Sequence, residues 1–193
     1  MNDLTAIRRL HEHRQWATHH LLKAAAPLSD EQLQRPLAIG QGTLWRTLCH
    51  MYAAEYVWLE ALLGNADPLT PGDLPGQLPG NQAGEGRAET LDELIERWST
   101  LDTRWNAYLD DLTAEMLKQA IVKKSTSSYA QQTVGTSALD IVLHVCTHAH
   151  YTLAQAMNML RKLGVEPLPH SMLITLARQQ AVERESSGGF QQT

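Results

Sequence analysis

Three histidines have the side-chain type and the spacing for metal chemistry. His144 and His148 are four residues apart in a stretch with helical periodicity, so they project from one face. Two imidazoles at this spacing can hold one metal ion, as in the helix of zinc metalloproteases. His50 lies in a separate helical stretch, within a stripe of small side chains that lets a second helix come close. We predict that His50, His144 and His148 form the chemical site of the chain.

The predicted ligand of this site is a divalent metal ion, with zinc and nickel as the preferred candidates. Neutral imidazole suits zinc, nickel, copper and ferrous iron. Fewer than four protein ligands would leave a coordination position for water or substrate. The alternative is that each histidine is a hydrogen-bonded residue at the core or its boundary. In that case the bundle binds no metal.

Other polar residues near these histidines are weaker candidates. On a helix, Cys49 points about 100° away from His50, and Cys146 about 200° away from His148. Both cysteines are expected to be small buried hydrophobic residues. Arg46, one turn before His50, could meet an anion at the mouth of the bundle or be solvated. No role is assigned to Glu55.

Five of the six remaining histidines lie outside the 144–150 segment and receive no role. Four of them fall on several faces of the first predicted helix, and most of these are expected to be exposed: His11, His13, His19 and His20. His170 lies in a turn rich in proline.

The elements that must position the site are helices. Hydrophobic periodicity predicts helices over about 3–26, 43–64, 90–117 and 136–163. Thr43 and either Thr136 or Ser137 are the expected N-caps of two of them. Thr90 and Glu93 form the pattern of a capping box. This order predicts an all-α fold, a four-helix antiparallel bundle.

The connections between these helices differ in character. Residues 65–89 are rich in proline and glycine and predict a long mobile connection between the second and third helices. Residues 119–135 are compatible with a short hairpin, and residues 171–182 with a short fifth helix. We predict one domain over residues 1–182, followed by a disordered tail at 183–193.

Composition excludes several functional classes. The net charge is −5, and the basic residues are scattered, so no nucleic-acid partner is expected. The longest apolar run is too short to span a membrane, and no signal peptide is seen. Two cysteines do not make a disulfide framework. A cytoplasmic location is therefore expected.

Two segments carry a resemblance to a known family. The first is Gly42–His50 with Glu55, Trp58 and Gly64, and the second is Leu143–Tyr151 with Gln155, Leu163 and Gly164. They resemble the second and fourth helices of the DinB-like, damage-inducible family, which lies within a superfamily of helical thiol transferases. The likeness spans about residues 4–180. The resemblance implies the same helical bundle.

The resemblance also implies metal ligands. His50 and His148 match two ligand positions of the family, whereas Thr152 stands where the family has its third histidine. His144, one turn before His148, is the candidate substitute. The apolar face of this helix places His144 toward the edge of the bundle or against a second subunit.

For function, the resemblance implies a homodimer and a low-molecular-weight thiol substrate. In several relatives the metal holds such a thiol as thiolate for transfer or isomerisation, in stress or detoxification, while many relatives have no known activity. The leading hypothesis is a divalent-metal-binding protein, with enzymatic activity as a thiol S-transferase left open. The alternative is a metal-free scaffold or small-ligand-binding protein that has lost the site.

Overall fold

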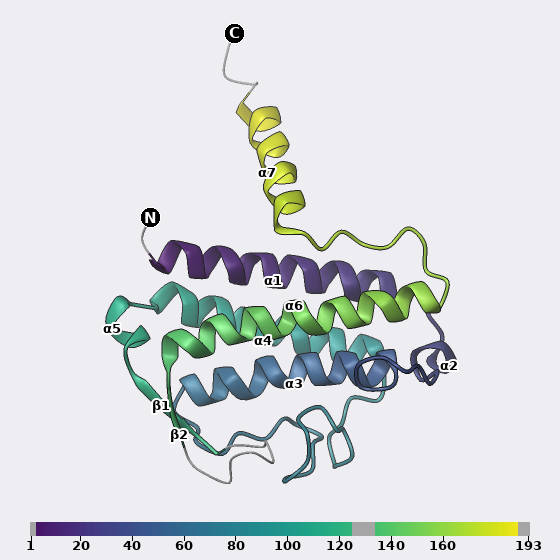
Figure 1. Ribbon diagram of the computed structural model, residues 1–193, viewed down its shortest axis with the longest axis horizontal. Coiled ribbons are helices and arrows are strands. Elements are labelled where there is room, and N and C mark those ends of the chain that lie inside the picture. The colour runs from purple at the N-terminus through teal and green to yellow at the C-terminus, as the bar shows by residue number, and fades with distance from the viewer. Residues whose placement is uncertain (1–2, 125–133, 189–193) are drawn as a thin grey trace.

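Four long helices lie side by side along the length of the molecule (Figure 1). They are α1 (Asp3–Ala25), α3 (Leu44–Leu62), α4 (Leu91–Asp111) and α6 (Ala138–Lys162). The structure is a computed structural model that describes residues 3–124 and 134–188. The predicted all-α bundle is confirmed, and the first, second and fourth helices begin and end within two residues of the predicted positions.

Side-chain caps begin the long helices where the sequence predicted them. The hydroxyl of Thr43 accepts the N–H of Arg46 at 3.1 Å, and the hydroxyl of Ser137, not of Thr136, caps α6. Thr90 accepts the N–H of Glu93, but the Glu93 carboxylate accepts the N–H of Glu89 and not that of Thr90. The reciprocal half of the predicted capping box is therefore wrong.

The third helix is shorter than predicted. It ends at Asp111, and the short helix α5 (Ala114–Leu117) follows, capped by Thr113. Between them Leu112 has an extended backbone, which directs its side chain into the core, where it is buried. The apolar spacing continues through this break, so periodicity alone predicts one helix.

Short elements complete the chain. The helix α2 (Asp30–Leu33) begins at a capping box of Ser29 and Gln32, in the connection between the first and second predicted helices. Strands β1 (Ala120–Lys123) and β2 (Val134–Ser137) pair antiparallel and confirm the expected hairpin. The residues that join the two strands, 125–133, lie outside the described residues.

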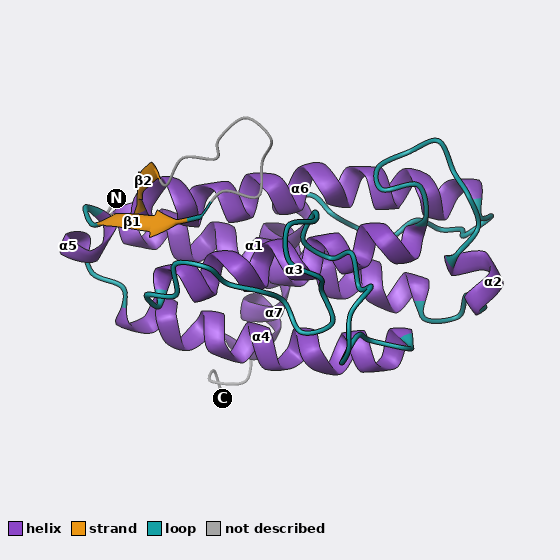
Figure 2. Cartoon of the chain, turned by 90° about the horizontal axis from the view of Figure 1, so that it is seen from below, coloured by secondary structure: helices purple, strands orange, loops and turns teal. Residues whose placement is uncertain are grey.

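The directions of the helices explain the long connection. The end of α3 and the end of the α4–α5 segment lie at the same end of the bundle, because the Lys124 N–H donates to the Ala66 carbonyl at 2.8 Å. The helices α3 and α4 therefore run in the same direction, and the chain must return along the bundle between them. The connecting loop (residues 65–89) does so across the outer side of α3 (Figures 1 and 2).

The core lies between the long helices. α6 packs against both α3 and α1, and α4 packs against α3 and α1. Trp98 and Trp105 of α4 are fully buried at the centre. Each long helix contributes an apolar face to one continuous cluster, which includes Leu21, Leu48, Leu59, Leu94, Leu101 and Leu160.

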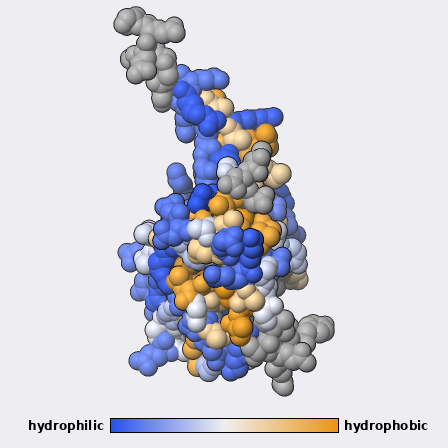
Figure 3. Space-filling model, turned by 90° about the vertical axis from the view of Figure 1, so that its left-hand side faces the viewer, coloured by the Kyte–Doolittle hydropathy of each residue, from blue (hydrophilic) through white to orange (hydrophobic). Residues whose placement is uncertain are grey.

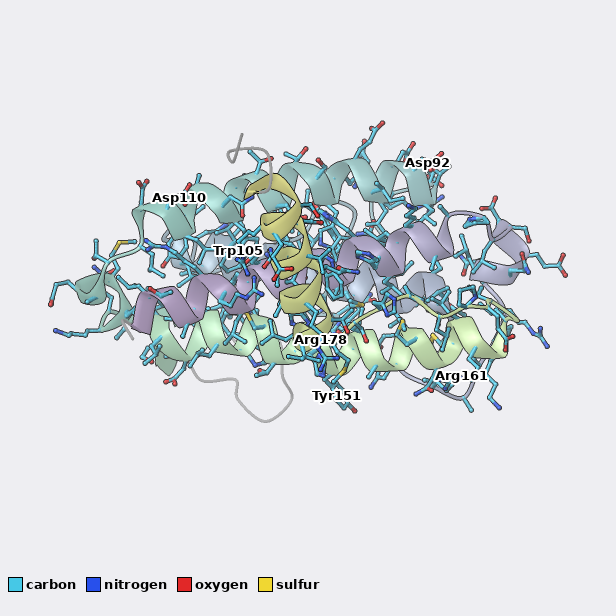
Figure 4. The ribbon with its side chains drawn as sticks, turned by 90° about the horizontal axis from the view of Figure 1, so that it is seen from above. Asp92, Trp105, Asp110, Tyr151, Arg161 and Arg178 are labelled. Atoms are coloured by element: carbon cyan, nitrogen blue, oxygen red, sulfur yellow. The ribbon has the colours of Figure 1, made fainter. Side chains whose placement is uncertain are left out.

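The last helix, α7 (Leu173–Gly188), does not join the bundle. It projects from the bundle on the side of α1 (Figure 1) and overlaps α1 when the molecule is seen from above (Figure 4). It is attached to α1 by a hydrogen bond of 2.6 Å between Arg9 and Gln180, and the ring of His13 donates to the Ser171 carbonyl. The helix continues six residues beyond the predicted end at 182. Residues 189–193 of the predicted tail lie outside the described residues.

The surface mixes polar and apolar side chains. Figure 3 views the end of the bundle near α5 and the hairpin, where orange and blue residues alternate. None of the helices in the described ranges has both the length and the apolar character needed to cross a lipid bilayer.

Candidate functional site

His50 and His148 face each other between α3 and α6. Their Nε2 atoms are 3.2 Å apart, and their rings meet edge to face with centroids 5.1 Å apart. Both side chains are half-buried. The structure thus places two of the three predicted site residues in direct contact, although they are 98 positions apart in the sequence.

The connecting loop determines which nitrogen of His50 carries its proton. The Nδ1 atom lies 2.8 Å from the Pro79 carbonyl oxygen, which can only accept a hydrogen bond. Nδ1 therefore carries the hydrogen, and in the neutral ring the lone pair of Nε2 points to His148. Without a metal, the Nε2–H of His148 completes the contact as donor.

His148 is held in the neutral form. Burial, together with the nearby His50 and His144, lowers the pKa of His148 to about 4. A neutral imidazole is the form that binds metal ions. A pair of neutral rings needs only a change of tautomer at His148 to present two lone pairs to one ion.

His144 lies beside this pair. Its ring centroid is 5.6 Å from that of His148 and 5.5 Å from the ring of Trp58, and the side chain is exposed. This agrees with the edge position that the helix geometry suggested. Within residues 3–124 and 134–188, no three His, Cys, Asp or Glu side chains are grouped to hold a metal ion. His144 as third ligand stays a prediction.

Thr152 follows His148 by one turn and is buried. Its hydroxyl donates to the carbonyl oxygens of His148 and Ala149, at 2.8 and 3.2 Å. These bonds engage the hydroxyl with its own helix. The position that the resemblance associates with a third histidine thus holds a neutral hydroxyl, which is a poor ligand for a borderline metal ion.

The spacing of the histidine pair fits a shared metal ion. Two nitrogen ligands of a tetrahedral zinc ion, each about 2.0–2.1 Å from the metal, lie about 3.3 Å apart. The Nε2 atoms of His50 and His148 are 3.2 Å apart. The second nitrogen of His50 donates to a backbone carbonyl, as it usually does in a metal-bound histidine. The donor set therefore fits two ligands of one ion.

An open cavity of about 340 Å³ adjoins His50. The connecting loop supplies one wall with Gln77, Leu78 and Gly80, and Arg46 lies on the helix side, one turn before His50. Arg46 is exposed, and its guanidinium makes no hydrogen bond or ion pair with any other residue that the structure describes. A small molecule in this cavity would meet a positive charge and the ring of His50.

The cysteines take no part in this arrangement. Cys49 and Cys146 are buried and unpaired. Burial raises the pKa of each thiol to about 12, so neither is a thiolate at neutral pH. The prediction that both are small core residues is confirmed.

A buried charge cluster that the sequence did not lead us to expect lies elsewhere in the bundle. It consists of Arg14 and His19 on α1, Glu55 on α3 and Asp102 on α4. The Arg14 guanidinium pairs with the Glu55 carboxylate and lies 3.6 Å from Asp102, which accepts a bond of 2.9 Å from His19. The indole N–H of Trp98 donates to Glu55 at 3.1 Å. The sequence signal that could have indicated this cluster is the presence of charged residues at apolar positions of three helices.

Burial dominates the chemistry of this cluster. It raises the pKa of Glu55, while the Arg14 charge opposes the shift. The hydrogen bond to Asp102 raises the pKa of the more exposed His19. A protonated His19 would balance the second carboxylate. The cluster is closed off by packed side chains, which is typical of a structural role.

Three of the four histidines on α1 are not exposed, which corrects the expectation. His11 is 1% exposed, and its Nε2–H donates to the Val142 carbonyl at 3.1 Å. His13 and His20 are half-buried, and each bonds to a backbone carbonyl, Ser171 and Trp16 respectively. His19 is the exposed member and bonds to Asp102.

Buried His11 predicts a measurable pH dependence of stability. Burial, helped by the Arg14 charge, lowers the pKa of His11 from 6.5 to about 3. Between these values the unfolded chain binds a proton that the folded chain does not. The contribution of neutral His11 to the free energy of unfolding is therefore complete above pH 6.5 and is lost as the pH falls toward 3. His11→Gln keeps the N–H donor and cannot titrate. The stability difference between the two proteins should change by about 1.4 kcal/mol per pH unit between pH 6 and 4.

Urea unfolding at several pH values tests this prediction. Parallel pH profiles of the wild type and His11→Gln would show that His11 titrates normally in the folded protein.

The fold and the site together define a class of protein. It is a helical bundle with a histidine pair between facing helices, where such bundles commonly hold a metal. The sequence profile of the DinB superfamily matches residues 13–156, a range that contains all three predicted site histidines. The chain belongs to the DinB superfamily, as its two motif segments indicated. No curated protein matches the chain significantly.

Proposed function

We propose that the protein binds a divalent metal ion, zinc or nickel, through His50 and His148, with His144 as third ligand. The observation that carries the proposal is the 3.2 Å approach of the two Nε2 atoms, with the His50 tautomer held by Pro79. His144 lies one turn from His148 and is exposed. It is therefore free to turn toward an ion held by the pair.

The substrate in this proposal is a low-molecular-weight thiol that enters the cavity beside His50. A divalent metal stabilises a thiolate at neutral pH, which is the chemistry that the ion supplies when bound. The chain itself orients the ligand. Arg46 and His50 are one turn apart on α3, so an anionic group of the thiol compound can pair with Arg46. The reaction would be an S-transfer in a cytoplasmic stress or detoxification response.

The second candidate function is a metal-free scaffold or small-ligand-binding protein. Thr152 favours it, because its hydroxyl donates to its own helix and is a poorer metal ligand than an imidazole. The 3.2 Å contact is then an ordinary hydrogen bond between two imidazoles.

Metal titration of the untagged, metal-free protein separates the two candidates. We expect one Zn²⁺ or Ni²⁺ ion per chain, with about 2.7 kcal/mol of stabilisation at a free metal concentration 100 times the dissociation constant. His50→Ala and His148→Ala should abolish this gain, whereas His170→Ala, an exposed histidine outside the site, should retain it. Thr152→His should raise the affinity. If His50→Ala leaves metal content and melting temperature unchanged, the scaffold function is favoured.

The proposal also includes a homodimer. Apolar side chains near α7 and on the outer face of α6 are exposed: Tyr151 66%, Met172 57% and Ile174 56%. Figure 4 shows Tyr151 pointing away from the bundle. Light scattering at micromolar concentration should therefore give about twice the chain mass of 21.5 kDa. Monomer mass there would contradict the dimer.

A further inference from the structure

The connecting loop lies in van der Waals contact with the backbone of α3 at His50. A Cβ atom at Gly80 would lie 2.5 Å from the Cα and N atoms of His50, closer than real Cβ contacts allow. Gly80 also has a φ of +86°, which favours glycine. The absence of a side chain at Gly80 thus lets the preceding residue, Pro79, bring its carbonyl to the His50 ring.

One buried carboxylate holds this part of the loop. Asp73 is 7% exposed and accepts three hydrogen bonds. Its Oδ2 accepts the Gly80 N–H at 2.6 Å, and its Oδ1 accepts the backbone and side-chain N–H groups of Gln82, both at 2.9 Å. All three donors lie within three residues of Pro79. Since charge-assisted hydrogen bonds are the strong ones, Asp73 is the main local restraint on this turn.

The restraint is transmitted to His50 through one peptide unit. The carbonyl carbon of Pro79 and the N–H of Gly80 belong to the same planar peptide group. Fixing the N–H on Asp73 therefore fixes the direction of the carbonyl oxygen, which accepts Nδ1–H of His50 at 2.8 Å. Asp73 and His50 bind opposite sides of one rigid group.

We propose that Asp73 is a positioning residue for His50: through the Pro79–Gly80 peptide it keeps the hydrogen on Nδ1 and the Nε2 lone pair directed at His148. The inference deepens the proposed function and rests on it, since an oriented Nε2 lone pair serves a metal ion. Such outer groups around a metal-bound histidine commonly change metal affinity by about 10–100-fold.

The test compares Asp73→Ala with the matched control Asp67→Ala. Asp67 lies in the same connecting loop, but its carboxylate is exposed and pairs with Lys124. The first readout is the ¹⁵N NMR spectrum of the metal-free proteins, which reports the tautomer of His50. We expect the Nδ1–H tautomer in the wild type and in Asp67→Ala, and a mixture of tautomers in Asp73→Ala. Asp73→Asn keeps an acceptor for Gly80 and should retain most of the Nδ1–H form.

The second readout is Zn²⁺ affinity of the same proteins. We expect Asp73→Ala to bind about 10–100-fold more weakly than the wild type and Asp67→Ala to bind equally. An unchanged His50 tautomer in a folded Asp73→Ala protein would overturn the inference, as would unchanged Zn²⁺ affinity. If the wild type itself binds no Zn²⁺, the proposed function fails, and the positioning of His50 is still decided by the tautomer measurement.

Discussion

Replacing Arg14 by Met is expected to lower the free energy of unfolding by about 3–5 kcal/mol, the usual cost of removing one partner of a buried ion pair. Arg14 is 3% exposed and contacts two buried carboxylates, those of Glu55 and Asp102. Without the guanidinium, these carboxylates must be protonated or remain buried as anions. Urea unfolding at neutral pH measures the loss.

Two comparisons separate charge from packing in this experiment. Arg9→Met removes an arginine from the same helix. Arg9 makes a partly exposed ion pair with Glu12 and a hydrogen bond to Gln180 of α7, both outside the bundle core, so the cost should stay at about 1 kcal/mol. The double variant Arg14→Met/Glu55→Gln removes one carboxylate together with the cation and should be more stable than Arg14→Met alone.

The pH dependence of Arg14→Met has a definite sign. Burial raises the pKa of Glu55 in the folded state, and without Arg14 no cation opposes this shift. The folded variant therefore binds more protons at Glu55 than the unfolded chain does. The stability deficit should therefore shrink as the pH falls below neutral. A deficit that stays constant would mean that lost packing, and not buried charge, destabilises the variant.

Gly80→Ala is expected to destabilise the protein by about 2–4 kcal/mol, from the positive φ and from overpacking against α3. Gly76→Ala is the matched control, because Gly76 has a φ of +75° in the same loop but nothing within 4 Å of its would-be Cβ. The control should show the cost of the backbone conformation alone, about 1–2 kcal/mol. Urea unfolding compares the two variants.

Limited proteolysis gives a second readout for the same pair. The connecting loop is the segment where the first cut is expected in the wild type, since it is rich in glycine and proline. Gly80→Ala should be cut there faster than Gly76→Ala. Equal rates would show that the contact with His50 does not hold the loop, and first cuts within 43–64 or 137–163 would contradict the helix boundaries.

Local signals in the sequence predicted most of the fold. Thr43 and Ser137 begin helices by accepting the backbone N–H three residues later. Such caps are local, so the residue type before a periodic stretch predicts them. The break at Leu112 was not predictable in this way. It depends on an extended residue whose side chain still packs in the core, and the apolar spacing is the same with or without the break.

The site was also predictable only where local signals mark its residues. His50 and His148 stand out by residue type and by their place in helical stripes, and the structure brings them together. The role of Asp73 depends on a turn of the connecting loop that only tertiary contacts define. The proline and glycine content of this loop predicts a mobile connection and does not reveal that turn. In the structure the turn at Pro79 contacts α3 through the hydrogen bond from His50 Nδ1, and Asp73 holds that turn within the loop.

The buried charge cluster also bears on the axial alignment of the helices. Leucine and alanine contacts tolerate sliding, because a helix displaced by one turn, about 5.4 Å, still meets apolar neighbours. Such a displacement of α1 would separate Arg14 from both Glu55 and Asp102, which lie on two different helices. Only one register of α1 against α3 and α4 keeps these charges together. The same register fixes the axial positions of the other side chains on these helices. The charge cluster therefore helps to define the alignment in which His50 and His148 meet.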